Sequence, residues 1–243
     1  MATNFDLKAK KRLIEQLADS PTALICNAAD LLGIEVPYMD QTVKCLSPGL
    51  PPLVGEAVTI KLDSSTPGNK ADAESYFRML DEMSGKDLPQ VVIVQTVGAH
   101  KKRECAAGDG MAKTMISVGA AGLVTDGGIR DLKDILNQGF KVFGAGQVVH
   151  HTPYVWSGLY EPVQIGGITV RTGDIIHGDM DGMIVVPEES WDNIIAACQV
   201  TLDFEKKAHL VLRQSGLSVS SKKDQVKALW DAALADRKTN QEL

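Results

Sequence analysis

The sequence lacks any run of about 20 apolar residues, which is the length that a helix needs to cross a membrane. The first residues also lack the apolar stretch of a secretory signal. Cysteine is scarce and forms no Cys-x-x-Cys pair, so neither a zinc knuckle nor a redox motif is indicated. The four cysteines are Cys26, Cys45, Cys105 and Cys198. We therefore expect a soluble, cytoplasmic protein with reduced thiols and no membrane partner.

Basic residues are not in excess either. The chain has 25 Lys and Arg against 31 Asp and Glu, a formal charge of -6. A protein that binds a phosphate backbone generally needs a clustered basic face, so nucleic acid is not an expected partner. With 243 residues, 44% of them hydrophobic, the chain can bury one sizeable core. A single main domain over residues 1–243 is therefore the default expectation.

Hydrophobic periodicity predicts a mixed α/β fold. Helical spacing predicts one helix over residues 5–19 and a second that ends near Leu32. From residue 90 onward, short apolar strands alternate with helices in the order βαβαβ. The strands are expected near 91–94, 122–124 and 140–143, and the helices near 109–118 and 131–138. This order predicts a parallel sheet that is covered on both faces.

The flanking segments add antiparallel strands and C-terminal helices. A half-buried strand is predicted at 56–62, because apolar and polar residues alternate there. Three further short strands are expected at 163–165, 168–171 and 183–186, followed by helices at roughly 188–213 and 221–236. Ser221 and Asp224 suggest a capping box for the last helix. Its apolar stripe is typical of a core or an oligomer contact, and consists of Val226, Leu229, Trp230 and Ala233.

Two loops are the main candidates for chemistry, because both follow predicted parallel strands and should open at the same edge of the sheet. One contains Gly108-Asp109-Gly110, the other is residues 125–131, and each leads into a helix N-terminus that favours an anion. Arg130 is a permanent planar cation, and Asp109 and Asp131 are oxygen donors of the kind that Mg²⁺ or Mn²⁺ takes. Asp at a helix N-terminus is also commonly only a cap, so the structural interpretation stays open here.

Twenty residues separate Asp109 from Arg130-Asp131. This Asp-x20-Arg-Asp pattern resembles that of the 4-hydroxy-4-methyl-2-oxoglutarate aldolase family and its RraA-like relatives. Residues 48–59 and 173–187 also match, so that the resemblance covers about residues 20–200, with a C-terminal helical extension over about 200–243. It implies an α/β fold of the swivelling β/β/α type with flanking helices. It also implies a homotrimer or a hexamer made of two trimers, with active sites at subunit interfaces.

The resemblance further implies roles for single residues. Asp131 matches the family residue that holds a divalent metal, Mg²⁺ or Mn²⁺, whose remaining shell is largely water. Arg130 matches the residue that contacts the keto oxygen of the substrate. Gly108 is expected in the substrate site, and the backbone N–H groups of Gly110 and Met111 are expected to receive a pyruvyl carboxylate.

The implied function is that of a metal-dependent class II pyruvate aldolase, a carbon–carbon lyase acting on an oxo-acid. Metal and Arg130 would stabilise an enolate, and Asp109 would position a metal-bound water that moves protons. Oxaloacetate decarboxylation passes through the same pyruvate enolate, so one site could perform both reactions. The alternative is a non-catalytic RraA-like regulator that binds and inhibits ribonuclease E. Regulators of that kind tend to lack the acid that Asp109 supplies.

Weaker features remain. The loop at 63–70 is predicted to lie at the surface, near a site or away from one. His150 and His151 would point to opposite faces of a strand, so a shared metal is disfavoured and a substrate-pocket role for one of them stays open. His177 is interpreted as structural or exposed. Three acids are interpreted as turn residues and not as a calcium loop, namely Asp174, Asp179 and Asp181.

Overall fold

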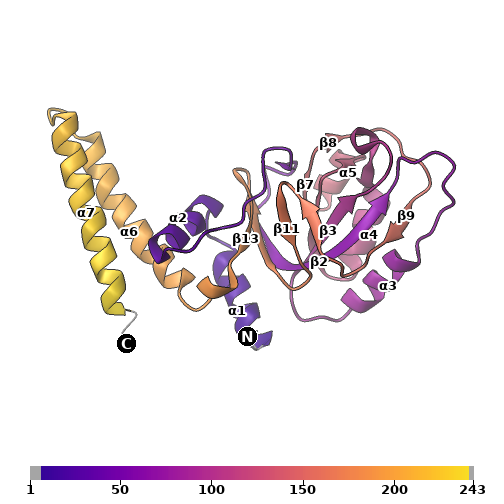
Figure 1. The fold of residues 1–243 in the computed structure, drawn as a ribbon, viewed down its shortest axis with the longest axis horizontal. Coiled ribbons are helices and arrows are strands. Elements are labelled where there is room, and N and C mark those ends of the chain that lie inside the picture. The colour runs from indigo at the N-terminus through magenta and orange to yellow at the C-terminus, as the bar shows by residue number, and fades with distance from the viewer. Residues whose placement is uncertain (1–6, 241–243) are drawn as a thin grey trace. The chain divides into compact units, whose positions relative to one another are not determined.

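A computed structural model describes residues 7–240 of the chain (Figure 1). The chain forms two compact units. One consists of the residues up to Thr22 together with Pro37–Val186, and the other of Ala23–Val36 together with the residues from Pro187 onward. The predicted helix over 5–19 is α1 (Leu7–Leu17), with residues 5 and 6 outside the described range.

An eight-stranded mixed sheet forms the centre of the first unit, in the order β1-β7-β5-β3-β2-β12-β13, with β9 also paired to β2. Its middle is parallel, as predicted, and consists of β2 (Leu53–Asp63), β3 (Gln90–Thr96), β5 (Ala120–Thr125) and β7 (Lys141–Gly144). The antiparallel strands are β1 (Lys44–Cys45), β9 (Val155–Ser157), β12 (Ile175–Asp179) and β13 (Gly182–Val186).

Both faces of this sheet are covered, as predicted, but by different structures. Val92 and Val94 of β3 belong to a core shared with three helices, namely α3 (Glu74–Met83), α4 (Asp109–Ser117) and α5 (Leu132–Asn137). Val91 and Ile93 face the opposite core, which a β-hairpin closes. That hairpin pairs β10 (Val163–Ile165) with β11 (Ile168–Val170). Alternate residues of one strand therefore fill two cores, which explains the continuous apolar run in β3.

Several elements differ from the sequence-based expectations. The strand β2 is almost entirely buried and not half-buried, because both of its faces are covered. The helix α3 was not predicted. Three very short parallel strands were also missed, since two or three residues carry no periodicity. They are β4 (Cys105–Ala107), β6 (Gly128–Ile129) and β8 (Gly146–Gln147), and they form a small sheet of their own.

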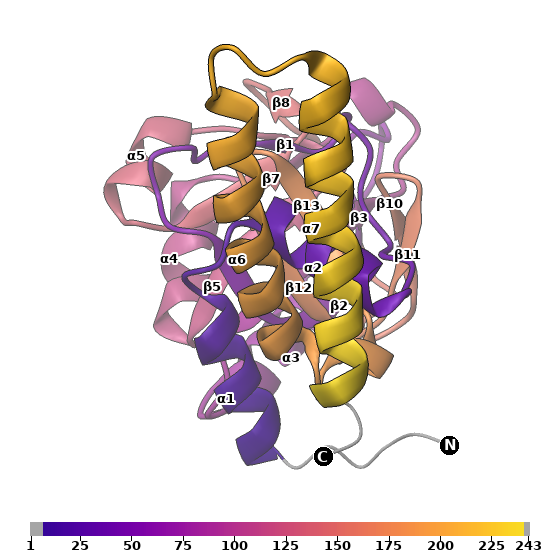
Figure 2. The same ribbon diagram turned by 90° about the vertical axis from the view of Figure 1, so that its left-hand side faces the viewer.

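The second unit is helical. It contains α2 (Thr22–Leu32), α6 (Ile194–Arg213) and α7 (Val219–Asn240), of which α6 and α7 run antiparallel and side by side (Figure 2). Trp230 of α7 packs edge-to-face on Phe204 of α6, with ring centroids 5.0 Å apart, so the predicted apolar stripe contacts its own chain. The predicted capping box is wrong, because α7 begins two residues earlier and the Ser218 hydroxyl accepts the Ser221 N–H. None of the described helices is long and apolar enough to cross a membrane.

Candidate active site

Arg130 and Asp131 lie where β6 ends and α5 begins. The Arg130 N–H donates to the Ala107 carbonyl at 3.0 Å, which ties the end of β6 to the end of β4. Asp131 has a left-handed backbone, with φ of 53°, and its carbonyl accepts the N–H groups of Asp134 and Ile135. Asp is one of the few residues that tolerate this conformation. Asp131 is therefore the turn residue that starts α5, and its carboxylate is left for other contacts.

Gly108 brings the first predicted loop against the second. A Cβ atom at position 108 would lie 2.8 Å from Oδ2 of Asp131 and 3.0 Å from Nε of Arg130. Nε of Arg130 is buried, lies 3.4 Å from Oδ2 of Asp131, and makes no hydrogen bond within the described chain. The sequence-based expectation that these two loops meet is therefore confirmed, and Nε of Arg130 is a buried donor that makes no hydrogen bond in the described chain.

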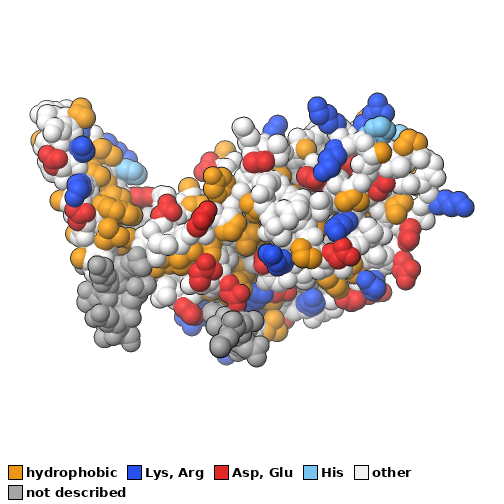
Figure 3. Space-filling model, viewed as in Figure 1, with side chains coloured by type: hydrophobic (Ala, Val, Ile, Leu, Met, Phe, Trp, Pro, Cys, Tyr) orange, Lys and Arg blue, Asp and Glu red, His pale blue; other side chains and the backbone are white. Residues whose placement is uncertain are grey.

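A cavity of about 1180 Å³ opens beside these residues. Its walls carry Arg130 and Asp131 together with Ser64, Ser65, Pro67, His100, Lys102, Arg103, Ile129, Leu132, Lys133, and residues 147–153. Among these lining residues, all within the described range, Asp131 is the one carboxylate, whereas four carry a permanent positive charge. Basic side chains and histidine gather along the edge of this unit near β8 and α5 (Figure 3). The cavity therefore favours an anionic ligand.

Asp109 begins α4 and is partly exposed. Its carboxylate pairs with Lys113 one turn along the helix, at 2.7 Å. This contact with Lys113, aided by the charge of Arg130, holds the pKa of Asp109 below its ordinary value. Asp109 is not among the residues that line the cavity, and neither are Gly110 and Met111. The roles expected for these three residues stay predictions, whereas Gly108 does lie against Arg130 and Asp131.

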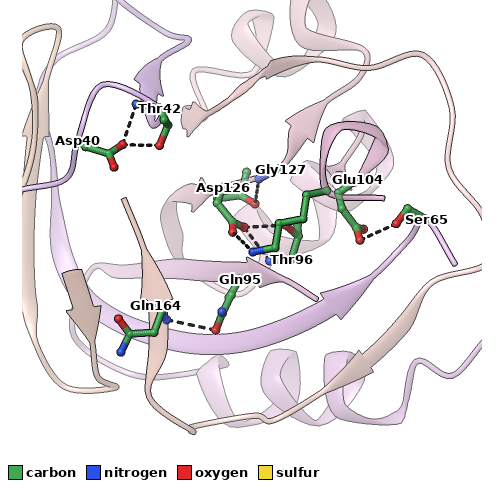
Figure 4. Close-up of polar contacts among 11 residues, drawn as sticks. Asp40, Thr42, Ser65, Gln95, Thr96, Glu104, Asp126, Gly127 and Gln164 are labelled. Carbon is green, nitrogen blue, oxygen red and sulfur yellow. Dashed lines mark hydrogen bonds and ion pairs between the residues drawn. The ribbon is translucent and has the colours of Figure 1, made fainter. Parts of the chain in front are cut away.

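A buried acid that the sequence analysis missed supports one wall of the cavity. Glu104 is fully buried and accepts three hydrogen bonds. The N–H and hydroxyl of Ser64 donate to it at 2.8 and 2.6 Å. The hydroxyl of Ser65 donates at 2.8 Å (Figure 4). The Ser64 hydroxyl in turn accepts the N–H of Cys105 at 2.9 Å. Glu104 therefore fastens the loop at 63–70 to β4, and that loop lies at the site. No local pattern in the sequence marked Glu104.

Asp126 of the second predicted loop has a structural role. Its carboxylate accepts the N–H and the hydroxyl of Thr96, at 2.7 and 2.9 Å, which joins the ends of the parallel strands β3 and β5 (Figure 4). Lys101 lies 3.9 Å from the same carboxylate. Asp126 is not among the residues that line the cavity, so it shapes the loop that leads to Arg130.

The two adjacent histidines do not behave as strand residues. The segment between β8 and β9 is irregular, so the alternation expected of a strand does not apply. Both His150 and His151 line the cavity, with ring centroids 5.6 Å apart. His177, by contrast, is buried and bonded to the Leu17 carbonyl and the Thr22 hydroxyl, which confirms a structural role. Asp174 and Asp179 accept backbone N–H groups within tight turns, as expected.

The donor set of the cavity fits a hydrated divalent cation. No group of three or more metal-ligating side chains occurs in the described residues. A cation such as Mg²⁺ usually keeps several water ligands and needs only one or two carboxylates. Asp131 offers a carboxylate whose side chain is 42% exposed, and its Oδ2 lies 3.4 Å from Nε of Arg130. A metal that requires four protein ligands, such as structural zinc, does not fit.

Comparison with known proteins places the chain in a family. A family model described as RraA-like (Aldolase/RraA) matches residues 22–185. A protein of Halalkalibacterium halodurans named "putative 4-hydroxy-4-methyl-2-oxoglutarate aldolase" is 30% identical over 77% of this chain and 82% of its own length. Among solved structures, one described under novel cellulases from gut-associated microbes is 26% identical, with a TM-score of 0.71, and covers 85% of this chain and 90% of that one.

A second solved structure supports the fold alone. Streptomyces coelicolor RraAS2, described as an unusual member of the RNase ES inhibitor RraA protein family, is 23% identical with a TM-score of 0.64. The match covers 84% of this chain and 96% of RraAS2. The predicted fold class is thereby confirmed as the mixed α/β fold of these structures. Because the family model spans well over half of the sequence and includes the whole cavity region from Ser64 to Pro153, the chain belongs to the RraA-like family.

Proposed function

We propose that the chain is a divalent-metal-dependent carbon–carbon lyase that releases pyruvate from an oxo-acid. The observation that carries the proposal is the pairing of Arg130 and Asp131 on the wall of a large cavity. Apart from Asp131, the charged residues of that wall are all basic. The relative from Halalkalibacterium halodurans, named for aldolase activity, supports the same reaction class.

The charges of the cavity agree with an oxo-acid substrate. Lys102, Arg103 and Lys133 line the cavity beside Arg130, so a ligand with one or more carboxylates would be held electrostatically. The buried Nε of Arg130 makes no hydrogen bond in the described chain and is suited to a substrate oxygen, because an unsatisfied buried donor gains a full hydrogen bond when a ligand arrives.

Each residue then has a distinct part in the reaction. Asp131 would hold the Mg²⁺ or Mn²⁺ ion, and the bound ion would supply Lewis acidity that stabilises negative charge on the keto oxygen. Arg130 would donate to the same oxygen as it becomes an enolate. Gly108 leaves room for both groups, since any side chain there would collide with them. Asp109, from the start of α4, would influence proton transfer at longer range.

The other descriptions found among similar structures fit the site less well. Glycoside hydrolysis uses two carboxylates that flank the scissile bond, and the described cavity lining offers only Asp131. Inhibition of a ribonuclease is the second candidate from the sequence analysis. Regulators that resemble this sequence tend to lack the acid that Asp109 supplies, and this chain has it.

The test is a pyruvate-release assay on a panel of oxo-acids, including oxaloacetate and 4-hydroxy-2-oxo-acids, with Mg²⁺, with Mn²⁺ and with a chelator. We expect metal-dependent release, and we expect Asp131→Asn to lose both activity and Mn²⁺ affinity in calorimetric titration. Asn tolerates the left-handed backbone, so the variant should fold. Asp134→Asn, an exposed acid in the first turn of α5, is the matched control.

The outcomes separate the candidates. Metal-independent release, or equal Mn²⁺ affinity in Asp131→Asn and the parent protein, would contradict the assignment of Asp131. Inhibition of ribonuclease E combined with no pyruvate release from any oxo-acid would favour the regulator.

We also propose that the protein assembles as a homotrimer or a pair of trimers, as the family resemblance implies. Light scattering at micromolar concentration would test this, and a stable monomer would contradict it. Trp230→Glu tests whether α7 contributes. Trp230 already packs on Phe204 within the chain. We therefore expect this variant to lower the stability of the helical unit at least as much as it weakens the association of subunits.

A further inference from the structure

His151 is held in one orientation by two contacts. Its Nδ1 lies 2.7 Å from the carbonyl oxygen of Thr152, and its ring stacks on Tyr154 with centroids 4.1 Å apart and an interplanar angle of 18°. A carbonyl oxygen can only accept, so Nδ1 carries the proton in this contact. In the neutral ring Nε2 is then an acceptor, and it has no hydrogen-bond partner among the described residues.

His151 lines the same cavity as Arg130 and Asp131, and its stacking partner contacts the strand that leads to Gly108. Tyr154 is partly buried and its hydroxyl donates to Sγ of Cys105 at 3.8 Å, in the strand that leads to Gly108. Burial raises the pKa of Tyr154 well above its ordinary value, and the charges of Arg130 and Asp131 both act on its hydroxyl. Tyr154 therefore connects the ring of His151 to Cys105, in the strand that leads to Gly108.

Besides His151, the cavity wall carries two imidazoles that can take a proton, His100 and His150, but both residues are exposed and neither ring has the two contacts that orient His151. Lys102, Arg103, Arg130 and Lys133 are donors, and Asp131 is the proposed metal ligand. Asp109 is paired with Lys113 and lies outside the lining. A hydroxy-oxo-acid bound in the cavity nevertheless carries a hydroxyl proton that must leave when the carbon–carbon bond breaks.

We propose that His151 is a further catalytic residue of the lyase, with Nε2 accepting the proton of the substrate hydroxyl. In this step the O–H bond breaks and its electron pair forms the new C=O bond of the leaving carbonyl product. The bond between C3 and C4 breaks, and its electron pair passes into the pyruvate enolate beside Arg130. The enolate then takes a proton from solvent to give pyruvate, and the imidazolium returns its proton to solvent.

This inference rests on the proposed function. It is tested separately by comparing two reactions, cleavage of a 4-hydroxy-2-oxo-acid and decarboxylation of oxaloacetate. Oxaloacetate decarboxylation gives the same enolate but has no hydroxyl to deprotonate. His151→Asn keeps a donor for the Thr152 carbonyl and removes the acceptor at Nε2, whereas His151→Phe keeps the stack on Tyr154. We expect both variants to lose about 10²-fold or more in cleavage of a 4-hydroxy-2-oxo-acid and to change oxaloacetate decarboxylation by less than about threefold.

His150→Asn is the matched control, because His150 is exposed on the same cavity and has neither contact. We expect it to retain both activities. A nitrogen-15 NMR spectrum of histidine-labelled protein without metal gives an independent readout, in which the signals lost in His151→Asn should report an Nδ1–H tautomer. An Nε2–H tautomer, or equal losses of cleavage and decarboxylation in both variants, would overturn the assignment of His151. A parent protein with neither activity would overturn the proposed function itself.

Discussion

Gly108 lies against the carboxylate of Asp131 so closely that a Cβ atom at position 108 would stand 2.8 Å from Oδ2. The glycine is not needed for its backbone, since its φ of -128° is open to any residue. It is needed for space, because it lets the start of α4 approach the Arg130-Asp131 turn. The two loops expected from the sequence to share a site are joined at this contact.

Gly108→Ala should therefore disturb the site without preventing folding. The methyl group would push the Asp131 carboxylate and Nε of Arg130 away from their positions, and we expect Mn²⁺ affinity to fall roughly tenfold. Calorimetric titration measures the change. Gly110→Ala is the matched control, since a Cβ at Gly110 meets nothing within 4 Å and α4 should gain stability. Equal affinities in the two variants would show that Asp131 does not depend on the space at Gly108.

Arg130→Lys should retain metal but lose turnover by about 10²-fold or more, because a lysine ammonium cannot reproduce the planar fork of donors. Steady-state kinetics beside Mn²⁺ titration measures both quantities. Arg103→Lys, at an exposed arginine on the same cavity, should leave turnover nearly unchanged. Undiminished turnover in Arg130→Lys would remove the guanidinium from the reaction.

Asp109→Asn should lower turnover at least about tenfold if this acid contributes to proton transfer. The structure supplies a control, because Lys113 is the residue that pairs with Asp109. Lys113→Gln removes that partner and leaves the carboxylate in place, so it should retain most of the activity. If the two variants lose equal activity, the ion pair and not the carboxylate matters, and Asp109 is a helix-stabilising residue.

His177 should make stability depend on pH. Burial lowers the pKa of its imidazole below the ordinary value of 6.5, so the unfolded chain takes up a proton before the folded one does. Stability should be constant above that value and fall as the pH drops below it, by at most about 1.4 kcal/mol per pH unit. Urea denaturation at a series of pH values measures this slope. His177→Gln should flatten the slope, whereas His209→Gln, at an exposed position, should leave it unchanged. A parent protein with no slope in this range would contradict the prediction.

Much of the architecture was accessible from local sequence. The sequence correctly predicted three parallel strands, at 91–94, 122–124 and 140–143, and the helices between them. Buried parallel strands appear as continuous apolar runs, whereas helices show apolar residues at helical spacing. The pattern from Asp109 to Asp131 directed attention to the edge of the sheet where the cavity opens, since the carboxyl ends of parallel strands meet there.

Other parts of the site depend on residues that are distant in sequence. Glu104 is satisfied in the interior by hydrogen bonds from Ser64 and Ser65, about 40 residues earlier in the chain. A single glutamate next to basic residues gives no sign in the sequence that it will be buried. The irregular segment after β8 gave no period, so the sequence could not show that His150 and His151 line one cavity.

By itself, therefore, the sequence determined the order of most strands and helices and the family, and it predicted the pair Arg130-Asp131 as the centre of the site. The tertiary structure decided which side chains surround that pair. It placed Gly108 against Asp131, turned Asp109 toward Lys113, and left Nε2 of His151 without a partner beside the cavity. The physical reason is that backbone periodicity is encoded locally, whereas a binding site is made by close packing between segments that the chain brings together only when it folds.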